Sequence, residues 1–104
     1  MDINIESLQI EVNGRREHYL KAGTGKPVVL VHGGASASRE WLPIMEGYGD
    51  RFCFYAPDLP GFGESARDPK GYYLPDFCDF LLGFIASLKL EKPALDKLFT
   101  VFKR

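Results

Sequence analysis

Residues 28–34 read VVLVHGG, and this stretch decides the fold class. It begins with a short, uninterrupted apolar run, which is typical of a strand buried on both faces, as the central strands of parallel sheets are. A second such run, FCFYA, occupies residues 52–56 and leads into PDLPGFGES at 57–65, a segment dense in turn-forming residues. Two buried strands that each end in a glycine-containing loop predict an α/β protein built on parallel strands.

The chain before these strands predicts an antiparallel hairpin. Apolar side chains alternate with polar ones over much of residues 3–12, as in a strand with one buried face. Asn13 and Gly14 follow, a pair that tolerates positive φ and forms the tightest hairpin turns. We therefore expect a returning strand over residues 15–22.

Two helices are expected to connect the strands. Pro43 is tolerated only in the first turn of a helix, so a short helix is expected to begin near residue 40. A longer helix is predicted over residues 74–88, where apolar side chains recur at helical spacing. Alternating strands and helices imply a mixed sheet with right-handed crossovers.

Length, composition and charge exclude several classes of protein. A chain of 104 residues makes one domain at most, and 45% hydrophobic with 26% charged residues is close to the globular average. Thirteen Lys and Arg against fourteen Asp and Glu give a formal charge of −1, without the basic excess that binding to nucleic-acid phosphates requires. No apolar stretch approaches the roughly 18 residues of a membrane span, and the N-terminus lacks the basic start of a signal peptide. We expect a cytoplasmic protein that binds neither nucleic acid nor membranes.

No motif for a metal, a disulfide or a nucleotide cofactor stands out in the sequence. Cys53 and Cys78 lie inside apolar runs, which favours reduced thiols in the core over a disulfide or a zinc site. Residues 23–26, GTGK, precede a strand instead of joining a strand to a helix, so they do not form a phosphate loop. We expect no cofactor and no metal.

Two loops on successive buried strands resemble the N-terminal part of the α/β-hydrolase fold family. The resemblance rests on HGGAS at 32–36, on Trp41, and on a D-x-x-G-x-G-x-S loop at 58–65. It covers most of residues 1–95 and implies a partial α/β-hydrolase sheet, with an antiparallel N-terminal hairpin, two parallel strands and crossover helices. Relatives of the esterase, epoxide-hydrolase and carbon–carbon hydrolase kinds cleave esters, epoxides or related small molecules through a nucleophile, an acid and a His.

The resemblance implies an oxyanion-binding role for the first of these loops. Gly34 matches the position whose backbone N–H holds a developing oxyanion in the family. Gly33 and Ala35 support the loop by their small size, which lets backbone donors approach a substrate closely. His32 is expected to support the loop by hydrogen bonding, because the family's catalytic His comes much later in the chain.

The second loop is expected to shape the site without acting on a substrate. Asp58 is interpreted as an acceptor for the backbone amides of its own turn, which contains Gly61 and Gly63. His18 is expected to be a half-exposed residue of the returning strand.

The catalytic residues themselves are expected beyond residue 95. In relatives the next strand leads straight into a nucleophile elbow, whereas residues 96–104 read DKLFTVFKR, with no G-x-S-x-G, no later acid and no late His. We therefore expect that the chain holds no catalytic residue, that the C-terminal half of the fold is absent, and that the chain alone is inactive. The expected organisation is part of an α/β-hydrolase domain over 1–95 and a non-family tail over 96–104. A small-molecule substrate is expected only for a full-length parent.

The tail itself allows two interpretations. Its apolar residues recur at i, i+3, i+4 and i+7, which predicts an amphipathic helix or a chance run from a shifted reading frame. Without a further strand, the outer edge of the strand at 28–31 would be unpaired, and such an edge invites self-association. The alternative to a hydrolase fragment is therefore a non-catalytic module that binds a partner or itself.

Overall fold

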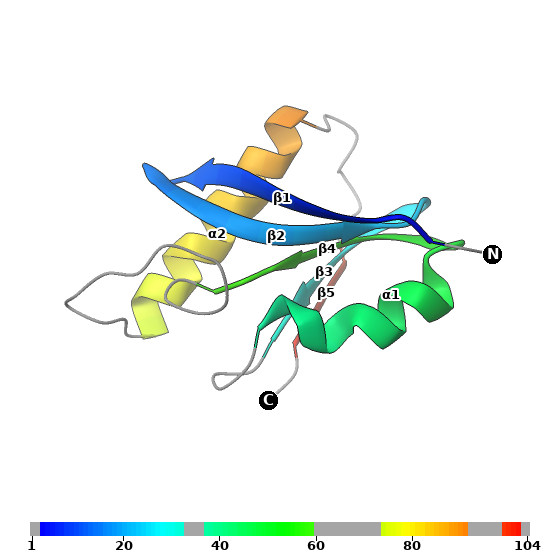
Figure 1. Ribbon diagram of the computed structural model, residues 1–104. Coiled ribbons are helices and arrows are strands. Elements are labelled where there is room, and N and C mark those ends of the chain that lie inside the picture. The colour runs from blue at the N-terminus through cyan, green and yellow to red at the C-terminus, as the bar shows by residue number, and fades with distance from the viewer. Residues whose placement is uncertain (1–2, 33–36, 60–73, 92–98, 103–104) are drawn as a thin grey trace.

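The computed structural model describes residues 3–32, 37–59, 74–91 and 99–102 (Figure 1). Its elements follow the alternation expected from the sequence. They are, in chain order, β1 (Ile5–Val12), β2 (Arg15–Ala22), β3 (Lys26–Val31), the short 3-10 helix η1 (Ser38–Trp41), α1 (Leu42–Tyr48), β4 (Phe52–Pro57), α2 (Leu74–Glu91) and β5 (Phe99–Phe102).

The described strands form one mixed sheet in the order β1-β2-β4-β3-β5. β1 and β2 pair antiparallel, and β2 pairs antiparallel with β4. β3 is parallel to β4 on one side and to β5 on the other. The predicted class, an antiparallel N-terminal hairpin joined to parallel strands with crossover helices, is confirmed.

The turn of the hairpin has the chemistry that its two residues predict. Asn13 has a φ of 52° and Gly14 a φ of 81°, so both adopt the left-handed conformation that two-residue hairpin turns require. The turn pairs Val12 with Arg15 and fixes the register of the whole hairpin.

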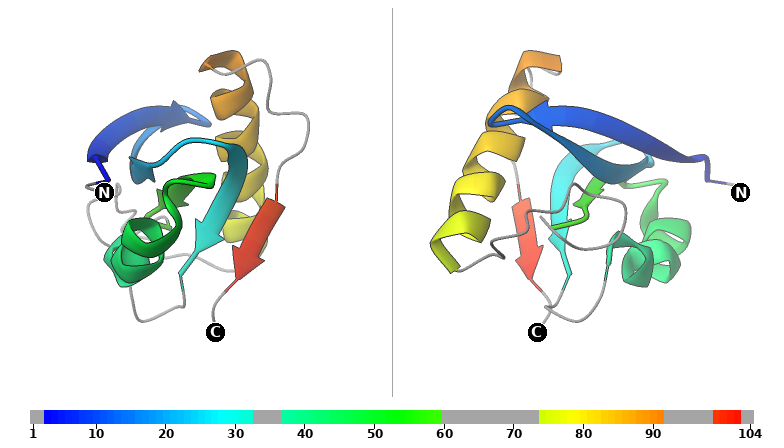
Figure 2. Two further views of the ribbon diagram at one scale, coloured as in Figure 1. Left: turned by 90° about the vertical axis from the view of Figure 1, so that its right-hand side faces the viewer. Right: turned by 60° about the vertical axis from the view of Figure 1, so that its left-hand side comes forward.

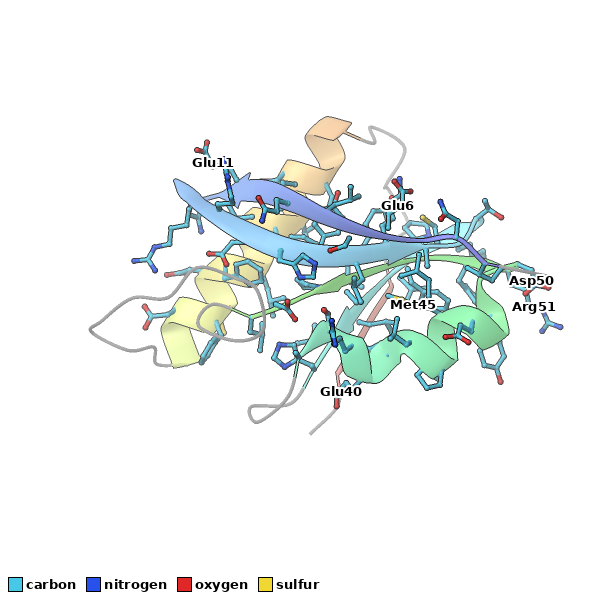
Figure 3. All side chains as sticks on the ribbon, viewed as in Figure 1. Glu6, Glu11, Glu40, Met45, Asp50 and Arg51 are labelled. Carbon is cyan, nitrogen blue, oxygen red and sulfur yellow. The ribbon has the colours of Figure 1, made fainter. Side chains whose placement is uncertain are left out.

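Helices cover both faces of the sheet, with α2 on one side and η1 and α1 on the other (Figure 2). Val29 and Val31 pack on the α2 side, and Val28 and Leu30 on the side of η1 and α1. The run 28–31 is apolar throughout because successive side chains of a strand point to opposite faces, and both faces are buried. Met45 is completely buried where α1 faces the sheet (Figure 3).

The last strand corrects two expectations. Residues Phe99–Phe102 form β5, not a helix, and pair in parallel with β3 from Val28↔Phe99 to Val31↔Phe102. The outer edge of β3 is therefore paired, contrary to the prediction. Phe, Thr and Val favour strands wherever an open edge offers backbone partners, and this tertiary preference outweighs a helical period seen over so few residues. Residues 96–98 lie outside the described part of the chain.

The helices begin where the sequence predicts but differ in detail. η1 leads into α1, whose first turn holds Pro43, and α2 continues to Glu91, beyond the predicted end at residue 88. Both cysteines are free, but Cys53 is only half-buried and Cys78 is exposed, so the predicted burial of Cys78 is wrong. None of the helices in the described ranges is long and apolar enough to span a membrane.

Candidate functional site

The carboxyl ends of the parallel strands meet at one edge of the sheet, where α/β folds place their ligand sites. His32 follows β3 directly, and Asp58 and Leu59 follow β4. All three residues are buried. The remaining residues predicted for this site lie outside the described part of the chain: Gly33, Gly34, Ala35, Gly61 and Gly63.

Two hydrogen bonds in opposite directions join the loops at this edge. The Leu59 backbone N–H donates to His32 Nε2 over 2.9 Å. The Ser38 backbone N–H donates to Asp58 Oδ1 over 2.6 Å. The pair fixes the chain on both sides of residues 33–36, because His32 precedes that segment and Ser38 lies just beyond it. His32 thus makes a loop-supporting hydrogen bond, and its Nε2 lone pair is engaged as an acceptor.

Asp58 makes a second strong contact, with His18 of β2. Asp58 Oδ2 lies 2.6 Å from His18 Nδ1, and both side chains are buried, with 2% and 4% of their surface exposed. The expectation that His18 is half-exposed is therefore wrong. Asp58 bonds another loop and another strand, whereas its predicted bonds within the turn at 61–63 lie outside the described residues.

The register of the sheet explains this contact. Tyr19 pairs with Pro57, so the next step of the antiparallel ladder sets His18 opposite Asp58, and the Asp58 backbone N–H donates to the His18 carbonyl oxygen over 2.9 Å. Because the two residues are 40 positions apart in the sequence, no local sequence pattern predicts this contact.

Ser7 completes the row of side chains and was missed by sequence reasoning. Its Oγ lies 2.6 Å from His18 Nε2. β1 pairs Gln9 with His18, so Ser7 is the diagonal neighbour of His18 on the same face of the hairpin. The sequence did contain a signal for this neighbour, because the two-residue turn at Asn13 and Gly14 fixes the register of the hairpin.

The polar side chains at the described loop ends are engaged in hydrogen bonds. His32 and Asp58 are both held in hydrogen bonds between the loops. Trp41, the last residue of η1, is buried and packs in the core. Across the described ranges, no three His, Cys, Asp or Glu side chains come together as a metal site would require.

A comparison with protein families decides the identity of the scaffold. A family model described as the alpha/beta hydrolase fold matches residues 26–95, which include β3, β4 and both loops. The chain belongs to the α/β-hydrolase fold family. The mixed sheet, the helices on its two faces and the loops at its carboxyl edge are thus parts of an α/β-hydrolase domain.

The α/β-hydrolases similar to this chain are named for more than one activity. A soluble epoxide hydrolase of Corynebacterium sp. (strain C12) is 38% identical over 72 residues, which are 69% of this chain and 25% of that protein. Haloalkane dehalogenase 2 of Mycobacterium tuberculosis is 34% identical over 88 residues, 84% of this chain and 31% of that protein. The crystal structure of a haloalkane dehalogenase variant, DbeA-M1, from Bradyrhizobium elkanii superposes with a TM-score of 0.85 at 25% identity, covering 96% of this chain and 32% of that one. The chain therefore spans a quarter to a third of the length of these relatives.

Proposed function

We propose that the loops after β3 and β4 form the oxyanion-binding side of a hydrolase site for small molecules such as epoxides, alkyl halides or esters. The observation that carries this proposal is the pair of opposed hydrogen bonds between the loops after β3 and β4. They anchor His32 and Ser38, the described residues that flank positions 33–36, at the edge where the parallel strands end. A backbone donor must be held in place in advance to stabilise charge that develops during a reaction.

Gly34 is the residue that we assign to this donor. Its backbone N–H would stabilise the developing negative charge, with Gly33 and Ala35 leaving space for the substrate. His32 and Asp58 act as positioning residues for its loop, and we assign Gly61 and Gly63 to the support of the second loop. The nucleophile, the acid and the general base are then supplied from outside these 104 residues.

The position of β5 supports a site in which this chain provides the oxyanion donor and the catalytic residues come from outside it. Val31 pairs with Phe102, so β3 and β5 end at the same level of the sheet. A nucleophile on a turn that follows a strand in this position would lie beside the loop that contains Gly34. The chain on its own is therefore expected to leave epoxides and haloalkanes unchanged, and turnover of either substrate by the purified chain would contradict the proposal.

A chimera tests the assigned donor directly. Residues 26–95 of this chain replace the matching region of the Corynebacterium epoxide hydrolase, which keeps its own catalytic residues. We expect epoxide turnover in the chimera, and a loss of about 10²–10³ in kcat when Gly34→Pro removes the backbone N–H. Gly34→Ala keeps the N–H and is the matched control. Equal kcat values for the Pro and Ala variants, both folded, would refute the role of Gly34.

The DNA after the codon for Leu95 provides a second test. A Gly-x-Ser-x-Gly sequence in one of the other two reading frames, or the same motif with Asp or Cys for Ser, would support a hydrolase whose frame has shifted. The motif should be followed by an acid and a His. Its absence from both frames would favour the second candidate function.

That second candidate is a non-catalytic module that associates with itself, and an open apolar groove favours it. The groove has a volume of about 480 Å³ and runs between α1 and the sheet, where Ile44 and Tyr48 are 37% and 48% exposed. Apolar surface of this kind is commonly buried in an interface. If it is an interface, Ile44→Glu should convert a dimer to a monomer in light scattering, whereas the exposed Glu46→Lys should not.

A further inference from the structure

We infer that Ser7, His18 and Asp58 form a second reactive site, in which Ser7 accepts an acyl group from a small activated ester. The geometry is that of a nucleophile, a base and an orienting carboxylate in series. Ser7 Oγ lies 2.6 Å from His18 Nε2, and His18 Nδ1 lies 2.6 Å from Asp58 Oδ2. Serine hydrolases use the same two imidazole nitrogens in the same order.

The hydrogen-bond partners determine which nitrogen carries the proton. An ionised carboxylate can only accept, so Asp58 requires a proton on His18 Nδ1. Nε2 then presents its lone pair to the Ser7 hydroxyl, as a general base must. Asp58 cannot easily turn away, because its other oxygen accepts the Ser38 backbone N–H.

The site combines a buried base with an accessible nucleophile. His18 and Asp58 are buried, whereas Ser7 is exposed on the edge strand β1. The three residues border a cavity of about 370 Å³, which is large enough for a small acyl group. The exposed Arg39 also lines this cavity, and its positive charge would stabilise an oxyanion that develops there.

The expected step is a simple acyl transfer. Ser7 Oγ attacks the carbonyl carbon of the ester as its proton passes to His18 Nε2, and the tetrahedral intermediate then collapses. The bond to the leaving alcohol breaks, that alcohol receives the proton from His18, and Ser7 is left as an ester. This reaction uses neither Gly34 nor any residue outside the chain, so its test can fail while the test of the proposed function succeeds, and the reverse.

The experiment treats the full chain with p-nitrophenyl acetate and follows the release of nitrophenolate. We expect one equivalent to be released and one acetyl group to be found on Ser7 by peptide mapping. Ser7→Ala should abolish this burst. Ser87→Ala is the matched control, because the Ser87 hydroxyl donates to the Glu11 carbonyl oxygen at a distance from this site.

Two further variants separate a reactive site from a purely structural set of hydrogen bonds. His18→Gln should slow acetylation about a hundredfold, the low end of the contribution of a general base. Arg39→Ala, a change at an exposed position that leaves the buried pair intact, should also slow it and keeps the test valid if the His18 variant does not fold. Acetylation at lysine, tyrosine or the N-terminus alone would overturn the inference, as would a Ser7→Ala variant that reacts like the parent chain.

Discussion

At the scale of single residues, the junction between β2 and β3 depends on glycine. Gly23 has a φ of 91°, and a Cβ placed on it would lie 2.2 Å from the Phe52 carbonyl oxygen and 2.5 Å from that of Gly49. The neighbouring Thr24 N–H donates to the Gly49 carbonyl oxygen over 2.9 Å. The junction therefore packs against the chain entering β4 so closely that only a residue without a side chain fits.

Replacing this glycine should be severely destabilising. Gly23→Ala adds a backbone clash to an unfavourable φ, and we expect the free energy of unfolding to fall by more than about 3 kcal/mol. Gly14→Ala is the matched control, because Gly14 has a φ of 81° but open space around it, so only about 1–2 kcal/mol should be lost. Urea unfolding curves measure both values, and equal losses would show that the contact with Phe52 is unimportant.

Asp58 is the second residue on which local stability depends. Asp58→Ala removes the acceptor of the Ser38 N–H and of His18 Nδ1 in a buried setting. We expect a loss of about 2–6 kcal/mol, since each of the two buried donors deprived of its acceptor costs about 1–3 kcal/mol. The exposed Asp79→Ala should change stability by less than about 0.5 kcal/mol. Hydrogen exchange at the Ser38 amide should accelerate in the Asp58 variant alone, and unchanged protection there would contradict this role.

At the scale of elements, α2 is attached to the sheet through one face. Phe80, Phe84 and Leu88 recur every four residues and are buried against the β-strands. Phe84 packs edge-on against Tyr19 of β2, with ring centroids 5.4 Å apart, an arrangement that suits the charge distribution of aromatic rings. Leu82, on another face of the helix, is 70% exposed. This row is the fully buried part of the helix face, and the half-buried Phe77, Leu81 and Ile85 pack against the same cluster.

Truncating the centre of that row should detach the helix. Phe84→Ala leaves a cavity at a position with 0% exposure, and we expect a loss of about 3–5 kcal/mol in the free energy of unfolding. Leu82→Ala removes a similarly apolar side chain from an exposed position of the same helix and should cost less than about 0.5 kcal/mol. Guanidinium unfolding monitored by helical circular dichroism distinguishes them, and a small effect of Phe84→Ala would mean that α2 is held elsewhere.

At the scale of the whole molecule, β5 closes one side of the parallel region. It pairs with β3 alone within the described sheet, along the register from Val28↔Phe99 to Val31↔Phe102. Its backbone groups pair with the outer edge of β3, whose residues 28–31 are all apolar and buried. The short strand β5 thus covers an edge that would otherwise present unpaired backbone groups.

Deletion of residues 96–104 tests this role. The shortened chain loses the β3–β5 ladder, at about 1 kcal/mol net for each hydrogen bond, and exposes the edge of β3. We expect a lower urea midpoint and larger, concentration-dependent oligomers in light scattering than for the full chain. An unchanged midpoint together with an unchanged size distribution would show that β5 contributes nothing to the fold.

The sequence by itself determined the hairpin, the two buried strands, both helices and the family, because each depends on contiguous residues. Asn13 and Gly14 select their turn through their own φ preferences, and the run at 28–31 predicts burial on both faces through its composition alone. Only the tertiary structure decided the rest. β5 forms because the edge of β3 is available, and His18 meets Asp58 because the sheet register brings together residues 40 positions apart. Cys78 is exposed because α2 buries a single face. Contacts of this kind arise between elements, and no local preference of the chain encodes them.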